Sequence, residues 1–305
     1  MKTASFGKVG VLAGGPSNER DISLKSGKAV YNALISEGID AIFIDVYDNI
    51  HDIIKNNKID VAFIALHGRF GEDGTVQRIL ESAGIPYTGS GPNASRIALD
   101  KIASKEIFKT KNIPTPEYVV LEKTDFSIKD TAGLGLPLVV KPQFEGSSIG
   151  LSVVKEEKDL KWAIDKAFEF GPKALLEKYI EGRELTVGIL DDKALPVIEI
   201  VPKGRVYDYK AKYIDPNTQY LVPAPINEDA FVRAKELGLK AHAGLGCRGF
   251  SRVDMMMDKD GNIFVLEVNT IPGMTERSLL PKAASAIGLN FSKLCIKLIE
   301  NALKH

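Results

Sequence analysis

The stretch SRVDMMMDKDGNIFVLEVNTIPGMTERS, residues 251–278, decides the fold of the second half of the chain. Two apolar runs, 253–257 and 263–268, flank Asp260-Gly261, a dipeptide that favours a tight type I′ turn between antiparallel strands. With these two residues in the turn, Asp254 faces Glu267 and Arg252 faces Asn269. The stretch therefore predicts a β-hairpin with four polar side chains on one face, because side chains alternate along a strand.

The two faces of this hairpin differ in character. Carboxylates directly opposite each other repel unless positive charge lies close by, and a hard divalent cation with oxygen ligands meets that need. Asp254, Glu267 and Asn269 are thus a candidate metal site. A solvated face on which the charges meet water is the alternative interpretation. The metal site is favoured because the other face is apolar enough to be core; it is predicted to carry Val253, Met255, Met257, Phe264, Leu266 and Val268.

Composition narrows the class of protein. The chain has 305 residues, 44% of them hydrophobic and 26% charged, with 40 basic and 40 acidic side chains. This is the composition of a globular chain with two or three subdomains, and its balanced charge argues against a nucleic-acid or membrane-surface protein. Cys247 and Cys295 have neither metal nor redox spacing, and no apolar run reaches about 18 residues. We expect a cytoplasmic protein with reduced thiols.

The chain begins with alternating strands and helices. Strands are predicted at 8–12, 40–46 and 60–66, and helices at 19–37 and 50–57. Such alternation predicts a parallel sheet, which binds ligands at the carboxyl ends of its strands. Glu19, after the Gly14-Gly15 turn, and His67 are expected at that edge. A lone histidine is more often structural than catalytic, but the nearby Glu19 favours a role in the site.

A second unit is expected after one helix at 94–111, which carries Lys101. Strands at 138–141 and 151–155 flank the loop 142–150, PQFEGSSIG, which joins strand to strand and so is not a Walker loop. Its backbone N–H groups and the Ser147 and Ser148 hydroxyls can wrap phosphate oxygens, with Lys141 adding charge. A surface hairpin tip without function is the alternative.

The remaining segments complete the pattern. A helix is expected at 157–170, strands at 174–179 and 185–190, and helices at 227–245 and 291–303. The region 203–222 contains four tyrosines and four Lys or Arg residues without regular periodicity. A loop of this length in a compact enzyme is often a lid, and a polar surface excursion is the competing interpretation.

Motifs along the whole chain resemble the ATP-grasp superfamily and, within it, the D-alanine–D-alanine ligase family. Their order and spacing make the resemblance specific. The motifs are LAGGPSNERDISL (12–24), ALHGRFGEDGT (65–75), PYTGS (86–90), DK (100–101), VKP (140–142), EGSSIG (145–150), YDYKAKY (207–213), GFSRVD (249–254) and EVNTIPGMT (267–275).

The resemblance implies a fold and a set of cofactors. The fold is α/β and α+β: an N-terminal parallel-sheet α/β domain at 1–97, then two ATP-grasp subdomains at 98–182 and 183–305, whose antiparallel sheets clamp ATP. Two Mg²⁺ ions, which Mn²⁺ can replace, are held by the candidate metal ligands named above. The ATP-binding residues implied are Lys101, Lys141, Ser147, Ser148, Glu177, Lys178, Glu184 and Lys212.

The implied reaction forms an acyl phosphate from one D-alanine, which the amine of a second D-alanine then attacks. Arg252 and the Gly273 N–H would stabilise the oxyanion. The first substrate's ammonium would be held by Glu19, which is linked through Ser147 to Tyr213 on the lid, with His67 nearby. Ser278 and the Leu279 N–H would hold the carboxylate of the second substrate. Lys212, on the lid, would reach the transferred phosphate.

The resemblance also implies partners and leaves alternatives open. Small-molecule substrates and a homodimer are expected, with neither nucleic acid nor membrane as partner. Tyr213 favours the amide product over D-alanyl-D-lactate. The alternatives are a ligase whose second substrate is D-serine or D-lactate, another ATP-grasp carboxylate–amine ligase, and a catalytically inactive ATP-binding regulator. The inactive form is disfavoured because the metal ligands, Arg252 and both phosphate lysines are present.

Overall fold

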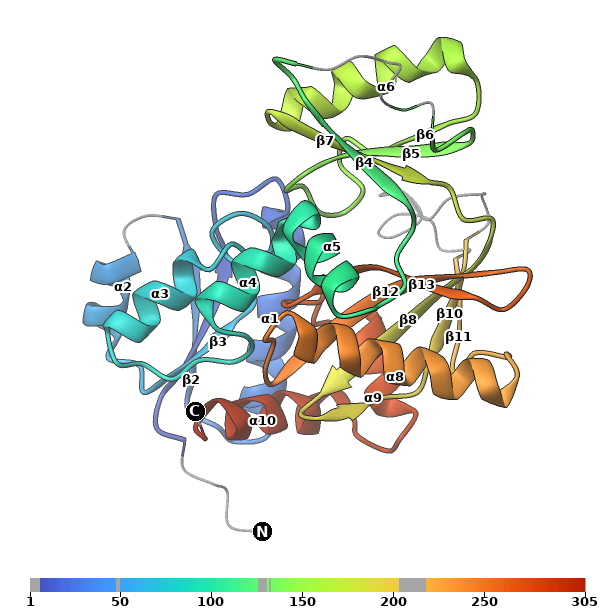
Figure 1. The fold of residues 1–305 in the computed structure, drawn as a ribbon. Coiled ribbons are helices and arrows are strands. Elements are labelled where there is room, and N and C mark those ends of the chain that lie inside the picture. The colour runs from blue at the N-terminus through green and yellow to red at the C-terminus, as the bar shows by residue number, and fades with distance from the viewer. Residues whose placement is uncertain (1–5, 48–49, 126–130, 132, 203–217, 305) are drawn as a thin grey trace.

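Three sheets, each with its own helices, build the molecule (Figure 1). The computed structural model describes residues 6–47, 50–125, 131, 133–202 and 218–304. The N-terminal unit lies beside the C-terminal sheet, and the central sheet with its helix forms a separate lobe above both (Figure 1). Within the described ranges, no helix is both long and apolar enough to cross a membrane.

The N-terminal unit is the predicted parallel sheet, with strand order β2-β1-β3. Every residue of β1 is buried, as expected for a strand enclosed on both faces. Beside β3, Tyr87 forms a single parallel bridge with Ala62. The elements are β1 (Val9–Gly14), α1 (Arg20–Ser36), β2 (Ala41–Val46), α2 (Ile50–Asn57), β3 (Val61–Ile64) and α3 (Thr75–Ser82).

The prediction of one helix at 94–111 is wrong. The chain forms α4 (Pro92–Leu99) and α5 (Lys101–Thr110), separated by Asp100 in an extended conformation with ψ 98°. The Asp100 carboxylate accepts hydrogen bonds from the backbone N–H groups of Ile102 and Ala103, both at 3.1 Å. A side-chain cap of this kind competes with helix continuation, so Asp100 starts a new helix and makes Lys101 its first residue.

The central lobe is an antiparallel sheet with strand order β4-β7-β5-β6. Its predicted strands and helix are confirmed within a few residues. Helix α6 packs its buried Leu160 and Ile164 on the face that carries Val140 and Leu176. On the opposite face, Val139, Val153 and Glu177 line a pocket. The elements are β4 (Tyr118–Glu122), β5 (Leu138–Pro142), β6 (Ser152–Val154), η2 (Glu157–Asp159), α6 (Leu160–Ala167), η3 (Phe168–Phe170) and β7 (Lys173–Lys178).

The C-terminal sheet has the strand order β11-β10-β8-β12-β13, with β9 paired to β8. Helix α8 covers one face, and α10 packs against α1 of the N-terminal unit. Residues 203–217 lie outside the described residues. The elements are β8 (Gly182–Leu190), β9 (Lys193–Ala194), β10 (Ile198–Val201), β11 (Gln219–Leu221), α8 (Glu228–Gly244), β12 (Phe250–Asp258), β13 (Ile263–Asn269), α9 (Leu279–Ser285) and α10 (Phe291–Ala302).

The predicted hairpin register is confirmed at the residues of the candidate metal site, where Asp254 pairs with Glu267 and Arg252 with Asn269. The predicted two-residue turn is wrong. The Asp258 N–H donates to the Asn262 carbonyl at 2.9 Å, so the loop has one more residue than predicted, with Gly261 at φ +83°. This is the three-residue hairpin loop that ends in a left-handed glycine.

A β-bulge restores the register that the longer loop shifts. Met255 pairs with Val265 next to the Asp254–Glu267 pair, so Leu266 is the extra residue of β13. The prediction that Phe264 and Leu266 belong to the apolar core face is therefore wrong. Their places in the core are taken by Ile263 and Val265, which pack in the C-terminal core with Val253, Met255, Met257 and Val268.

The linker between α5 and β4 lies against the outer edge of β13. The Val265 N–H donates to the Pro114 carbonyl at 2.8 Å, and the Thr115 hydroxyl donates to the Val265 carbonyl at 2.8 Å. These two bonds tie the first residues of the central lobe to the hairpin that carries Glu267.

The cap of α5 predicts a measurable contribution to stability. We expect Asp100→Ala to lower the free energy of unfolding by about 1 kcal/mol, because two backbone N–H groups lose their acceptor. Asp159→Ala is the matched control, since Asp159 precedes α6 but makes no side-chain cap bond. Urea unfolding followed by circular dichroism measures both. Equal losses in the two variants would contradict a specific role of this cap.

Candidate active site

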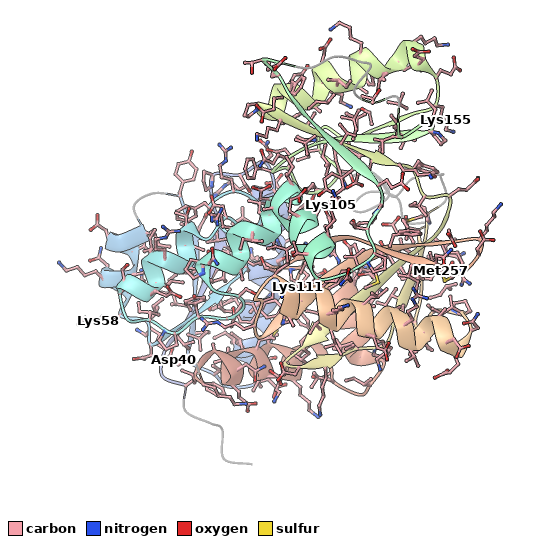
Figure 2. The ribbon with its side chains drawn as sticks, viewed as in Figure 1. Asp40, Lys58, Lys105, Lys111, Lys155 and Met257 are labelled. Atoms are coloured by element: carbon pink, nitrogen blue, oxygen red, sulfur yellow. The ribbon has the colours of Figure 1, made fainter. Side chains whose placement is uncertain are left out.

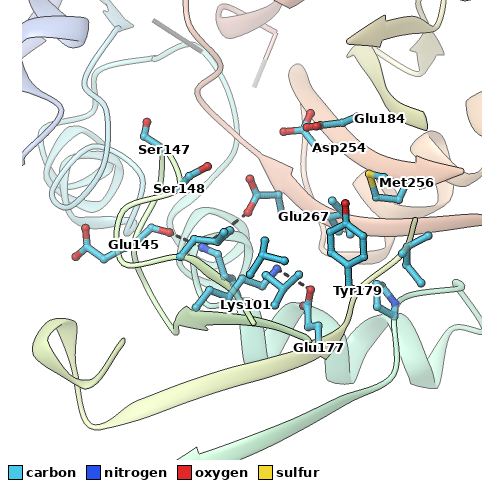
Figure 3. A pocket seen from close by; sticks show the side chains of 18 of the residues that line it. Lys101, Glu145, Ser147, Ser148, Glu177, Tyr179, Glu184, Asp254, Met256 and Glu267 are labelled. Carbon is cyan, nitrogen blue, oxygen red and sulfur yellow. Dashed lines mark hydrogen bonds and ion pairs between the residues drawn. The ribbon is translucent and has the colours of Figure 1, made fainter. Parts of the chain in front are cut away.

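A pocket lies between the central sheet and the hairpin face of the C-terminal sheet (Figure 3). Its lining combines charged groups with apolar side chains from both sheets. The lining residues are Lys101, Pro116, Val139, Lys141, Glu145, Gly146, Ser147, Ser148, Ile149, Leu151, Val153, Glu177, Lys178, Tyr179, Ile180, Glu184, Asp254, Met256, Leu266 and Glu267. Leu266 reaches the pocket because the bulge turns it away from the core.

Lys101 lies beside the loop 142–150, the serine-rich loop that joins β5 to β6. Its Nζ donates to the Glu145 carbonyl at 2.5 Å and is 3.8 Å from Glu267 Oε2 (Figure 3). The side chain is buried. The break at Asp100 aims this lysine into the pocket, and the Gln143 side chain donates to both Asp100 carboxylate oxygens at 3.0 Å. The helix start and the loop are therefore fixed to each other.

Glu177 lies between two lysines on the pocket wall. Its Oε1 is 2.7 Å from the Lys105 Nζ and its Oε2 is 2.8 Å from the Lys141 Nζ. Burial alone would raise the pKa of Glu177, but the two lysines outweigh it and lower the pKa. Sequence analysis missed Lys105, which is fully buried, because a helix lysine normally faces solvent.

Side-chain hydrogen bonds hold Asp254, one carboxylate of the predicted metal site, in place. Arg252 binds Asp254 through two bonds, Nε to Oδ1 at 2.8 Å and Nη2 to Oδ2 at 2.7 Å. The Thr186 hydroxyl donates to Asp254 Oδ1 at 2.7 Å. Asn269 Oδ1 accepts the Ile271 N–H at 3.0 Å and keeps a second lone pair. Paired carboxylates with an amide oxygen are a donor set that fits a hard divalent cation.

Glu19 contacts the serine-rich loop from the N-terminal unit. The Ser147 hydroxyl donates a short hydrogen bond to Glu19 Oε1. A Cβ added to Gly68 or to Gly146 would lie 2.9 Å from Glu19 Oε2, so only glycine leaves room for the carboxylate at both positions. Ser147 has φ 49°, a left-handed conformation that is costly for serine. The contact predicted between Glu19 and Ser147 is thus present.

Glu72 is a second buried carboxyl that sequence analysis did not single out. Its Oε2 accepts the Gly68 N–H at 2.8 Å. Burial, reinforced by the nearby Glu19 charge, raises the pKa of Glu72 to about 8. Its place in the HGRFGEDGT motif was the available signal. The direction of this shift favours the protonated carboxyl, which avoids two neighbouring negative charges at Glu19 and Glu72.

His67 is buried between the N-terminal unit and the 271–274 segment. Its Nε2 is 3.2 Å from the Ser26 hydroxyl, which also accepts the Met274 N–H at 3.2 Å. Burial lowers the pKa of His67 to about 4, although a hydrogen bond to the Ile271 backbone raises it. This placement fits a neutral histidine that fixes the segment carrying Gly273, rather than a proton donor.

The predicted second-substrate residues lie where β13 leads into α9. Ser278 precedes Leu279, the first residue of that helix. Its Oγ accepts the Thr275 N–H at 3.1 Å, and a Cβ on Gly273 would come within 3.1 Å of it. Gly273 and Ser278 are therefore neighbours.

The structure brings most of the predicted site residues to one region. Lys178 and Ser148 line the pocket, and Glu184 lies near Asp254 in the close view (Figure 3). Lys212 and Tyr213 lie outside the described residues.

Comparisons with known proteins agree with this architecture. The family model for the D-ala D-ala ligase C-terminus matches residues 107–300, and that for the N-terminus matches residues 47–90. The chain belongs to the D-alanine–D-alanine ligase family. As a member of it, the chain is a ligase enzyme with an ATP-grasp fold, and the predicted fold class and resemblance are confirmed.

Relatives in this family match along nearly the whole chain. The D-alanine–D-alanine ligase of Pelotomaculum thermopropionicum is 48% identical over 98% of this chain and 97% of its own length. That of Citrifermentans bemidjiense is 47% identical over 97% and 96%. A crystal structure of the Bacillus anthracis ligase complexed with ATP has a TM-score of 0.86 at 38% identity, covering 97% of both chains. Another structure of that ligase has a TM-score of 0.89 at 41% identity, with the same coverage.

In this D-alanine–D-alanine ligase family member, the histidine environment predicts a protonation state. We expect His67 and His242, whose pKa values are both lowered to about 4 by burial, to stay neutral at pH 5.5. Nitrogen-15 imidazole NMR, assigned with His67→Gln, measures this. An imidazolium signal from His67 at pH 5.5 would contradict the assignment.

The same shift has a consequence for stability. The unfolded chain binds protons at these histidines near pH 6.5, but the folded chain binds them only near pH 4. Their contribution to stability is therefore present above pH 6.5 and is lost as the pH falls towards 4. We expect His67→Gln to flatten the decline of the free energy of unfolding over this window, measured by urea titration.

Proposed function

We propose that this chain joins two D-alanine molecules into D-alanyl-D-alanine, with ATP as the source of the phosphoryl group, for peptidoglycan precursor synthesis. One observation carries the proposal. A single pocket joins buried lysines and facing carboxylates to the Glu19–Ser147 contact, in a chain of the D-alanine–D-alanine ligase family.

The nucleotide is proposed to lie between the apolar walls of the pocket. Val139, Val153, Met256 and Leu266 supply apolar walls suited to a flat base. The proposed adenine and ribose contacts are Glu177, Lys178 and Glu184. Lys101 and Lys141 are proposed to neutralise the charge of the transferring phosphoryl group, and Ser147 and Ser148 to cover it, with Lys212 added from the 203–217 segment.

The metal fits the hairpin face. Asp254, Glu267 and Asn269 are proposed to hold two Mg²⁺ ions, with Mn²⁺ as an acceptable substitute. When bound, the ions would neutralise the phosphate oxygens and align the terminal phosphate. The pair of Arg252 with Asp254 and the approach of Lys101 to Glu267 show that the hairpin face already attracts positive charge.

The first step is proposed to transfer the terminal phosphoryl group of ATP to the carboxylate of one D-alanine. A bond forms between the carboxylate oxygen and phosphorus, the bridging bond to ADP breaks, and an acyl phosphate results. Glu19 is proposed to hold the ammonium group of this substrate, and the family resemblance implies a link from Glu19 through Ser147 to Tyr213. His67, held by Ser26, supports the segment that borders the substrate.

The second step is proposed to form the peptide bond. The amine of the second D-alanine attacks the acyl carbon, loses a proton, and inorganic phosphate leaves. Arg252 and the Gly273 N–H would stabilise the oxyanion, and Ser278 with the Leu279 N–H would bind the second carboxylate. An acyl phosphate must be kept from water, which is the chemical purpose of a lid.

Three structural expectations belong to the same proposal. The chain is proposed to divide at 1–97, 98–182 and 183–305, to form a homodimer and to act in the cytoplasm. Their support is the family resemblance described above, together with the separate lobe formed by the central sheet.

A coupled assay for ADP tests the function. We expect ADP release that requires both D-alanine and Mg²⁺, with D-alanyl-D-alanine as the product by mass spectrometry. Adding D-lactate or D-serine distinguishes the related ligases, because each gives a product of different mass. ADP formed equally without any amino acid, or none with D-alanine, would exclude the proposal.

The metal ligands are tested by Glu267→Gln. We expect turnover to fall at least a thousandfold, because the uncharged amide weakens cation binding and charge neutralisation. Glu300→Gln, an exposed change on α10, is the control and should keep full activity. Circular dichroism checks the fold of both. Substantial activity in Glu267→Gln would refute the assignment of this carboxylate as a metal ligand.

A further inference from the structure

Lys105 is a buried cation just behind the pocket wall. Its side chain has 0% exposure, and its Nζ lies 2.7 Å from Glu177 Oε1 and 2.6 Å from the Thr115 hydroxyl. In Figure 2 it lies on α5, where the central lobe meets the rest of the molecule. It does not line the pocket, so it can act on a ligand only through its neighbours.

These contacts form a continuous path across the molecule. From Glu177 on β7, the path passes through Lys105 on α5 to Thr115 in the linker. Thr115 accepts from Lys105 and donates its own proton to the Val265 carbonyl at 2.8 Å. Val265 precedes Glu267 by two residues on β13. The ammonium group of Lys105 thereby joins the pocket wall of the central lobe, at Glu177, to the β12–β13 hairpin that carries Glu267.

The charges show what Lys105 adds. Glu177 with Lys141 alone is a neutral pair, whereas Lys105, Glu177 and Lys141 together carry one net positive charge. That charge lies beside a pocket proposed to receive polyphosphate. Burying such a triad is costly in desolvation, and apolar side chains of similar volume would often serve stability as well. A functional role accounts for a lysine at this position better than stability does.

We propose that Lys105 is a positioning residue for nucleotide binding: it holds Glu177 against Lys141 and aligns this pair with the hairpin that carries Glu267. The proposal rests on the ATP-dependent function proposed above. It concerns a residue that touches neither ATP nor amino acid and acts through Glu177 and Thr115.

The protonation of Lys105 gives the role a distinctive signature. Burial lowers the pKa of Lys105 to about 8, while Glu177 raises it and Lys141 lowers it further. Glu267 on β13 also raises it, and the ring of Tyr118 on β4 lies 5.6 Å from the Nζ. Tyr118 stays neutral because burial and Glu106 raise the pKa of its hydroxyl. Loss of the Lys105 proton above pH 8 therefore removes the net positive charge, and nucleotide affinity should fall.

The test compares variants of the full chain by isothermal titration calorimetry with the β,γ-imido analogue of ATP and Mg²⁺. Lys105→Met keeps the volume and removes the charge. Lys109→Met is the matched control, since Lys109 is an exposed lysine one turn later on the same helix. Thr115→Val breaks the link to Val265, and Thr115→Ser restores the hydroxyl. Thermal unfolding checks that each variant is folded.

We expect Lys105→Met to raise the Kd about tenfold at pH 7.5, with Lys109→Met and Thr115→Ser within twofold of the parent chain. From pH 7 to 9 the parent Kd should rise several-fold, and Lys105→Met should show no such rise. In the ADP assay, KM for ATP should rise with KM for D-alanine unchanged. A purely structural role would not produce this pattern.

Three results would overturn the proposal. The first is a Kd within twofold of the parent in Lys105→Met, and the second is a pH-dependent rise that persists in that variant. If Lys105→Met does not fold, Thr115→Val decides: a threefold or larger rise in Kd supports the relay, and an unchanged Kd refutes it. A parent chain that binds no ATP analogue would instead refute the proposed function itself.

Discussion

Two carboxylates that face each other across neighbouring strands need positive charge close to them, and the site is arranged around that need. Asp254 and Glu267 lie on one face of the hairpin, with Arg252 bound to the first and Lys101 approaching the second. These cations come from different parts of the chain, one from the strand itself and one from the start of α5. The same face that attracts these side chains suits a divalent cation. One arrangement of negative charge therefore accounts both for the contacts of Arg252 and Lys101 and for the proposed metal site.

The hairpin shows how far sequence reasoning reaches. The pairing of Asp254 with Glu267 is as predicted, yet the path to it differs, because the loop gains one residue and the Leu266 bulge removes the offset. Alternation and a turn dipeptide do not reveal the bulge. In the loop, Asp258 binds the N–H groups of Asp260 and Asn262, and this local competition selects the longer turn. The register was right because the two departures cancel.

Sequence patterns do not reveal which charged residues of helices and loops are buried. Only the family resemblance predicts that Lys101 belongs to the site. Lys105, four residues later, has the sequence context of an ordinary solvent-exposed lysine on a helix. Burial depends on which lobe packs against α5, and no local pattern records that packing. Glu72 is similar: its carboxyl is buried beside Glu19 because the loop after β3 folds back under Gly68. The parallel sheet, by contrast, follows directly from short-range alternation, and its elements were predicted well.

The linker between α5 and β4 covers part of the exposed edge of β13, where a strand from another molecule could pair. An outermost strand presents unpaired N–H and C=O groups, which invite a strand from another copy to add to the sheet. Pro114 and Thr115 occupy those groups on β13 at Val265. A linker that joins two lobes thus also blocks part of an edge where aggregation could begin. Breaking these two bonds would leave the N–H and C=O groups of Val265 unpaired at the edge of the sheet.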